Sequence, residues 1–129
     1  MLVKTKHYDN ENDIVMSPEL AFAIPAILAN TGVTANAEGK KIIKAGTPLY
    51  GTANVFKNRQ TVLTISGGEG ATIYGVARHD VDVTEGNVND TLLVAGYVDY
   101  LKLDSSVRTL VDAAEASLSR ILFVSGRDM

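Results

Sequence analysis

The sequence predicts one mainly β domain with a single helix near its C-terminus. Three observations lead to this prediction. From Gly39, for about sixty residues, apolar side chains alternate with polar ones or form short runs between turn residues, as strands do. One apolar stripe at helical spacing follows after Leu103. The chain has 129 residues, of which 46% are hydrophobic and 21% charged, the size and balance of one folded domain.

The predicted strands occupy the middle of the chain. We expect them at residues 40–46, 49–55, 61–66, 71–83 and 91–103. In the fourth of these segments Gly75 predicts a β-bulge or a close approach of two backbones, because glycine has no side chain to exclude a neighbour. The fifth segment is apolar on both faces, which is typical of a central strand in a small barrel or sandwich.

The predicted helix covers about residues 105–120, with Asp104 or Ser105 as its N-cap. Its apolar stripe consists of Val107, Leu110, Val111, Ala114, Leu118 and Ile121. A stripe of this kind packs against a sheet. The segment ILFVSG that follows predicts a terminal strand ending at Gly126, so the chain returns to the sheet after the helix.

Residues 1–13 are polar and mixed in charge. Such a segment is either a frayed tail or an arm that becomes ordered on a partner. In the second interpretation the arm extends to about residue 16, and the apolar residues at its two ends contact the partner: Leu2, Val3, Ile14, Val15 and Met16. We therefore divide the chain into an N-terminal arm with an apolar AIPA segment, residues 1–37, and a β-rich domain, residues 38–129.

The apolar segment that contains AIPA is compatible with two structures. Ser17 as N-cap and Pro18 in the first helical position resemble a helix start. Pro25 limits such a helix to one or two turns, because proline lacks an N–H group and restricts the residue before it. The alternative is an extended segment with Phe22 and Ile24 on one face.

Composition and charge exclude several classes of protein. Twelve Lys and Arg against fifteen Asp and Glu give a net charge of −3, so the positive footprint of a nucleic-acid-binding protein is missing. The absence of cysteine excludes disulfides, a thiolate nucleophile and Cys-ligated zinc. The sequence contains no apolar signal-peptide core and no run near the roughly 20 residues of a membrane span. We expect neither nucleic acid nor a membrane as a partner.

Charge is distributed unevenly along the chain. Residues 39–59 carry five bases and no acid, whereas residues 80–104 carry six acids and one base. These segments are either solvated faces or complementary edges that meet between neighbouring copies, because complementary patches fix the register of symmetric assemblies.

Asp80 and Asp82 lie in a DVDVT sequence that matches the DxDxT pattern of haloacid-dehalogenase-type phosphotransferases, in which the first Asp is the nucleophile and the second the acid/base. Those enzymes need the motif after an apolar parallel strand of a doubly wound domain, and two polar residues precede it here. In the non-catalytic interpretation Val81 and Val83 face a core, while the carboxylates on the other side form turn or interface hydrogen bonds.

Other chemical sites are not indicated. His7 and His79 are too few for a His-based zinc site unless carboxylates supply further ligands, and no HExxH spacing occurs. The glycine-rich segment 66–70 lacks the spacing that cradles phosphates, and no serine lies in a GxSxG elbow. We expect no catalytic residue, no metal site and no cofactor.

Several short motifs follow one another in residues 22–126: AIPA, AGTPLYG, YGVARHDVDVT, LLVAGYVDYLKL, a short helix and ILFVSGRD. Their order resembles the phage head decoration, or capsid cement, proteins of the lambda head-protein-D type. Members typically carry an AGT-like turn, a G-(V/I)-x-x-x-DVD(V/A)T segment and a strand similar to V-x-G-x-V-D-x-x-K-L. The matching residues here are Ala45, Gly46, Thr47, Gly75, Val76, Asp80, Val81, Asp82, Val83, Thr84, Val94, Gly96, Val98, Asp99, Lys102 and Leu103.

The resemblance implies a small β-tulip fold that assembles as a homotrimer on the outer surface of a phage capsid and stabilises the head. It implies a structural virion protein, made in the host cytoplasm and without catalytic activity, whose partners are the major capsid protein and itself. In related proteins an N-terminal arm adds to a strand of the capsid protein, a part that the apolar arm residues named above would play here. Two alternatives remain: a small phosphotransferase-like enzyme using Asp80 and Asp82, and a free β-barrel binding module.

Overall fold

The structure, a computed structural model of the whole chain, describes residues 14–67 and 71–125. Its strands are β1 (Phe22–Leu28), β2 (Ile42–Ile43), β3 (Pro48–Gly51), β4 (Val62–Leu63), β5 (Thr72–Ala77), β6 (Val81–Asp82), β7 (Val88–Asp99) and β8 (Ile121–Val124). Its helical elements are η1 (Pro18–Leu20), η2 (Tyr100–Lys102), α2 (Ser105–Ala114) and η3 (Glu115–Ser117). The predicted mainly β fold with one helix and a C-terminal strand is confirmed.

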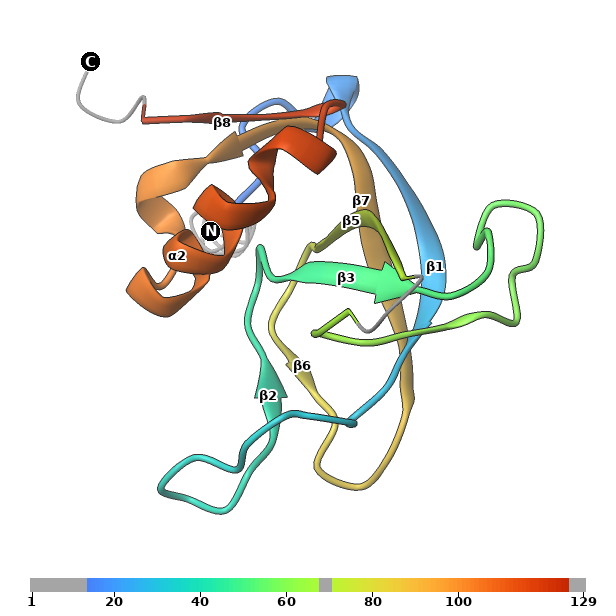
Figure 1. Cartoon of the computed structure of the whole chain (residues 1–129). Coiled ribbons are helices and arrows are strands. Elements are labelled where there is room, and N and C mark those ends of the chain that lie inside the picture. Colours follow the sequence, from blue (N-terminus) through green and yellow to red (C-terminus); the bar gives the residue numbers. More distant parts are fainter. Residues whose placement is uncertain (1–13, 68–70, 126–129) are drawn as a thin grey trace, which may run out of the picture.

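The long strand β7 organises the main sheet. The strand order is β3-β5-β7-β1-β4, and β8 pairs in parallel with the last residues of β7. The sheet curls (Figure 1) until Tyr50 of β3 and Thr64, next to β4, exchange two backbone hydrogen bonds of 2.8 and 2.9 Å. This isolated bridge does not close a barrel. The short strands β2 and β6 form a separate antiparallel ladder.

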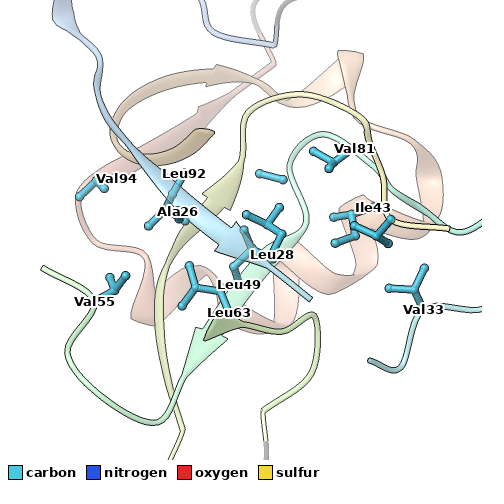
Figure 2. Close-up of a cluster of buried hydrophobic side chains, with 12 residues drawn as sticks. Ala26, Leu28, Val33, Ile43, Leu49, Val55, Leu63, Val81, Leu92 and Val94 are labelled. Atoms are coloured by element: carbon cyan, nitrogen blue, oxygen red, sulfur yellow. The ribbon is translucent and has the colours of Figure 1, made fainter. Parts of the chain in front are cut away.

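The first hydrophobic core fills the inside of the curled sheet (Figure 2). Strands β1, β2, β3, β4, β6 and β7 contribute the buried side chains of Leu28, Ile43, Leu49, Leu63, Val81 and Leu92. Because successive residues of a strand face opposite sides, β1 presents Ile24, Ala26 and Leu28 to this core.

The second core lies between β7 and the helix α2, which lies beneath β8 in Figure 1. The predicted helical stripe supplies the buried residues Val107, Val111, Ala114, Leu118 and Ile121. Leu110 is the exception, because its side chain is 46% exposed.

A bulge lets β7 contribute to both cores. The register changes between Phe22 and Ala23 of β1, so that Val94 is an extra residue on β7. A bulge of this kind turns two successive residues to about the same side and reverses the alternation beyond it. Val94 therefore faces the first core, whereas Val98, an even number of residues further along, faces the second.

Gly75 lies at both features that the sequence predicts for it. The register of β3 against β5 shifts between Leu49 and Tyr50, beside Gly75. A Cβ atom at Gly75 would lie 2.3 Å from the carbonyl oxygen of Leu93 in β7. Strands β5 and β7 can therefore approach this closely only because Gly75 has no side chain.

The segment that the sequence leaves open forms the single turn η1 and then the strand β1, and Ser17 makes no side-chain cap. Pro25 fits into β1 because its backbone nitrogen does not face β7. Its carbonyl accepts a hydrogen bond from the Arg59 guanidinium at 2.8 Å, which shows the direction in which the backbone of Pro25 points. The nitrogen of a strand residue faces the same side as its carbonyl, away from β7 in this case. On that side β4 pairs only with Ile27 and Leu28, so the missing N–H of Pro25 costs no ladder hydrogen bond.

Strand β1 lies between β7 and β4 within the main sheet. Two of its residues, Ala26 and Leu28, belong to the first core. The AIPA segment, which the sequence analysis groups with the arm in residues 1–37, therefore shares its sheet and its core with strands after residue 38.

The helix begins where the sequence predicts, with Asp104 as its N-cap. The Asp104 carboxylate accepts hydrogen bonds from the backbone N–H of Ser106 at 3.1 Å and from its hydroxyl at 2.6 Å. The α-helix ends at Ala114, before the predicted residue 120, because the chain tightens into η3. There the N–H of Leu118 bonds to the carbonyl of Glu115 at 3.0 Å, and the chain turns toward β8.

Candidate functional site

The motif residues that carry the resemblance meet around the turn Lys44–Thr47. The N–H of Thr47 donates to the carbonyl of Lys44 at 3.1 Å, and Gly46 has φ +93°, which favours glycine at the third position of such a turn. A Cβ atom at Gly46 would lie 2.5 Å from Cδ2 of Leu103. The AGT turn is thus packed directly against the end of the YVDYLKL segment.

Asp80 connects the same turn to the DVDVT segment. Its carboxylate accepts a hydrogen bond from the N–H of Ala45 at 2.8 Å, and the N–H of Gly46 donates to the carbonyl of Ala77 at 2.7 Å. Val81 and Val83 are 2% and 0% exposed. The valines therefore face the core while the first carboxylate of the motif holds the turn, as the non-catalytic interpretation predicts.

Asp82 closes a second local turn. Its carboxylate accepts hydrogen bonds from the backbone N–H of Thr84 at 2.9 Å and from its hydroxyl at 2.5 Å. The hydroxyl oxygen of Thr84 in turn accepts from the N–H of Lys41 at 2.8 Å. The hydrogen bonds from Thr84 lower the pKa of Asp82, because they favour the charged carboxylate. This ionised side chain therefore joins the end of β6 to the start of β2.

The fold around the DVDVT motif differs from that of the phosphotransferases whose pattern it matches. The strand β6 pairs antiparallel with β2 in a two-stranded ladder, whereas those enzymes place the motif after a parallel strand of a doubly wound sheet. Asp80 and Asp82 both accept hydrogen bonds from nearby backbone N–H groups. Their geometry fits a structural role for both carboxylates.

The basic and acidic segments meet within one chain. Strand β2 from the basic segment pairs with β6 from the acidic one, with Ile42 opposite Asp82. Lys44 Nζ also lies 3.2 Å from a carboxylate oxygen of Asp104. The hypothesis that these segments join neighbouring copies did not anticipate that they already contact each other inside the subunit.

Asp104 is the most strongly shifted acid that the structure describes. Hydrogen bonds from the Ser106 hydroxyl and backbone N–H, followed by the contact with Lys44, lower the pKa of Asp104 to about 2. Each of these groups favours the charged carboxylate at the N-terminus of α2. Asp104 therefore remains ionised over the physiological pH range.

A hollow of about 630 Å³ lies beside the turn, lined by Ile14, Lys44, Ala45, His79, Asp80, Lys102, Leu103 and Asp104. Its ionisable side chains all interact within the chain. Lys44 faces Asp104, Asp80 holds the turn, and His79 Nδ1 lies 3.3 Å from a carboxylate oxygen of Asp90; Lys102 also has an interaction of its own. The hollow carries both signs of charge and offers no isolated charge to a ligand.

Metal-ligating side chains do not gather in the described part of the chain. Within residues 14–67 and 71–125, no group of three or more His, Asp or Glu residues could hold a metal ion. His7 lies outside the described residues. In the same two ranges, no helix combines the length and the apolar character needed to cross a bilayer.

The five predicted arm residues fall into three environments. Leu2 and Val3 lie outside the described residues. Ile14 and Val15 are 3% and 7% exposed and belong to the second core, and Val15 forms a bridge with β7. Because these two side chains already pack in the protein's own core, they are not free to contact a partner in this structure. Met16 is 42% exposed and is the arm residue that the described structure leaves open.

The sequence analysis missed an exposed apolar face at the end of β7. Tyr97 is 40% exposed and Leu122, its neighbour on β8, is 54% exposed. Leu20 and Phe22, which follow the arm, are 63% and 57% exposed. The sequence predicts burial on both faces for the whole 91–103 segment, and its periodicity contains no signal that this end is covered on one face alone.

None of the three comparisons made for this chain, with family models, with curated proteins and with solved structures, gives a match.

Proposed function

We propose that this protein is a phage capsid decoration protein that binds the outer surface of the head as a homotrimer and stabilises it. One observation carries the proposal: the AGT turn, the DVDVT segment and the VDYLKL segment, far apart in the sequence, pack into one structural unit. Ala45 bonds to Asp80, and Gly46 packs against Leu103. The motifs that carry the resemblance thus contact one another and hold the same part of the fold together.

The third motif also has a structural role in this unit. The side chain of Asp99 is 5% exposed and accepts a hydrogen bond from the N–H of Leu101 at 3.1 Å, which caps η2. This cap directs the chain from β7 to Leu103 and then to the helix. The carboxylates of Asp80, Asp82 and Asp99 thus all accept hydrogen bonds that hold turns. For Asp80 and Asp82 this supports a structural role rather than phosphoryl transfer, because the nucleophile of a phosphotransferase has to be free to attack its substrate.

The proposed partners are the major capsid protein and two further copies of the chain. No enzyme activity, cofactor, nucleic acid or membrane enters the proposal, and the protein acts on the virion after synthesis in the host cytoplasm. On the arm side, Met16 is open, while Ile14 and Val15 connect it to the second core. An arm anchored in this way would transmit a capsid contact directly to the folded domain, and strand addition would supply its main-chain hydrogen bonds.

Co-sedimentation with capsids tests the proposed function. The particle used is an expanded capsid assembled from the major capsid protein of the phage that, under this proposal, encodes the chain. We expect the protein to sediment with these capsids to a saturating ratio and to raise their melting temperature, since binding to the assembled state stabilises it. The proposal fails if the protein stays in the supernatant, or if it hydrolyses a phosphorylated substrate in a metal-dependent way.

A further inference from the structure

Exposed apolar side chains of β1, β7 and β8 lie on one face of the sheet near the end of β7. Phe22 is opposite Ala95, and Tyr97 is opposite Leu122. Directly paired residues, and residues two apart on a strand, share a face. The N–H of Met16 donates to the carbonyl of Tyr97 at 2.9 Å, which places Met16 beside them. We call this surface, made of Met16, Leu20, Phe22, Tyr97 and Leu122, the outer face.

The outer face is the reverse side of a well-packed layer. Val98 and Ile121, which alternate with Tyr97 and Leu122, are 0% and 4% exposed against α2. In Figure 1 the helix lies on one side of β8, whereas Tyr97 and Leu122 on the other face are 40% and 54% exposed. A hollow of about 520 Å³ opens there between Leu20 on one side and β8 on the other. Five large apolar side chains gathered on one uncovered face mark an interaction surface rather than a solvated one.

We propose that the outer face is the surface through which copies of this chain contact one another, with the η1 side of one copy against the β8 side of the next. The proposal rests on the homotrimer of the proposed function and assigns a surface to it. A head-to-tail contact of this kind closes into a ring when its rotation matches the number of subunits. Each copy then buries its own Leu20 against the Leu122 of its neighbour.

Charge at the border of the outer face argues for a second copy as the occupant. Glu19 adjoins Leu20 on the η1 side, and Arg120 lines the hollow on the β8 side. Both side chains are exposed, and within the described residues neither forms an ion pair. A head-to-tail contact brings Glu19 of one copy to Arg120 of the next. The η1 side of one copy is therefore complementary in charge to the β8 side of the next, and opposite charges at the border of an interface fix its register.

The edge of β8 supports the same arrangement. Among the described strands, β8 pairs only with β7, so its outer edge has backbone N–H and C=O groups without a ladder partner. Proteins cover or block such edges, because an open edge invites pairing with another chain. A neighbouring copy seated against Leu122 would cover this edge together with the apolar side chains.

Native mass spectrometry of full-length variants tests the proposal. We expect Leu20→Glu and Leu122→Glu, each of which places a charge in the contact, to raise the concentration for half-dissociation by about 30-fold or more. The matched control is Leu110→Glu on α2, which changes a side chain of similar exposure, 46% against 54% for Leu122, and keeps the assembly of the unchanged protein. Circular dichroism verifies that all three variants fold.

A charge exchange tests the orientation without touching the apolar side chains. Glu19→Arg and Arg120→Glu should each weaken the assembly by about fivefold at low salt, because like charges then meet across the contact. The double variant restores the opposite pair in reversed order and should recover most of the loss. Additive weakening in the double variant would exclude a contact between these two residues and overturn the head-to-tail arrangement.

The outcomes separate this proposal from the proposed function. If Leu20→Glu and Leu122→Glu remain assembled like the unchanged protein, the outer face does not join copies, and loss of capsid sedimentation in those variants would assign it to the capsid instead. A single-chain mass for the unchanged protein at all concentrations also overturns the proposal. If the chain assembles through this face but does not bind capsids, the proposal stands and the proposed function fails.

Discussion

The turn unit around Lys44–Thr47 and the outer face around Tyr97 differ in how their side chains are satisfied. In the turn unit each conspicuous polar group has a partner within the chain: Asp80 holds Ala45, and Lys44 contacts Asp104. On the outer face large apolar side chains remain 40–63% exposed. The polar groups of the turn unit, whose sequence suggests chemistry, are therefore satisfied within the chain. The apolar side chains of the outer face, whose sequence resembles ordinary core, are not buried within the chain.

This difference indicates which of the two regions would gain more from a contact with another chain. Polar groups that already hold one another gain little from a partner, because a new contact must replace existing hydrogen bonds. Exposed apolar area gains free energy from burial at about 25 cal/mol per Å². We therefore expect substitutions in the turn unit to act on the stability of the subunit and substitutions on the outer face to act on the proposed contact between copies.

The largest effect is expected at Gly46. Its Cβ would lie 2.5 Å from the buried Leu103 side chain at φ +93°. Gly46→Val should lower the free energy of unfolding by about 4 kcal/mol, from left-handed backbone strain of about 1–2 kcal/mol and from overpacking. Urea denaturation measures the loss.

Gly39 is the matched control for that substitution, because it has φ +81° and a Cβ atom at this position would have no neighbouring atom within 4 Å. Gly39→Val should cost the backbone strain alone, about 1–2 kcal/mol. Equal losses at the two glycines would mean that the turn unit is not tightly packed, and the contrast between the two regions would disappear.

The arm residues give the next largest effect. Ile14 is 3% exposed in the second core, whereas Met16 is 42% exposed on the outer face. Ile14→Ala should lower the free energy of unfolding by about 3 kcal/mol, because it leaves a cavity in a packed core. Met16→Ala should change it by less than about 0.5 kcal/mol when both variants are compared as single subunits at low concentration. The reverse order would place Ile14 outside the core and return it to the arm.

Much of the fold follows from local patterns in the sequence. The stripe from Val107 to Leu118 and the cap at Asp104 predict the helix, and the missing side chain of Gly75 predicts the close approach of two strands. The helix and its cap depend on residues near one another in the chain, and the close approach depends on the missing side chain of a single residue. The helix and its cap can be predicted from the sequence because periodicity and capping are local properties.

The candidate site was harder to predict from the sequence, because its features depend on contacts between residues that are far apart in the chain. Val15 packs in the core through a bridge with Val98, and nothing in the N-terminal composition indicates that partner. The bulge at Val94 reverses the alternation of β7, so an apolar run that predicts burial on both faces ends with Tyr97 exposed. The sequence also did not indicate that the basic and acidic segments contact each other within one subunit, yet Lys44 forms an ion pair with Asp104 of its own chain.

A smaller effect concerns the pH dependence of the turn unit. Hydrogen bonds from Ser106 hold the pKa of Asp104 at about 2 in the folded protein, below its ordinary value of 3.8. A depressed pKa gives a stability contribution that is present above about pH 4 and is lost as the pH falls toward about 2. In urea denaturation from about pH 5 to 2, the stability difference between the unchanged protein and Asp104→Asn should therefore shrink. A difference that stays constant would show that this carboxylate has no special partner.

The smallest effect is expected for Asp80→Asn with Asp82→Asn. Asparagine keeps the side-chain oxygen that accepts from Ala45 and Thr84, but it removes the nucleophile and the acid that phosphoryl transfer needs. Capsid sedimentation and assembly should be unchanged in this double variant. Metal-dependent phosphatase activity in the unchanged protein that disappears in the variant would instead assign chemistry to the turn unit.

The mass of the full-length protein in solution tests the central claim most directly. A trimer joined through the outer face predicts about 41 kDa, three times the chain mass, and this mass should persist in native mass spectrometry at micromolar concentration. A mass of 13.8 kDa, that of one chain, at every concentration would contradict both the trimer and the role of the outer face.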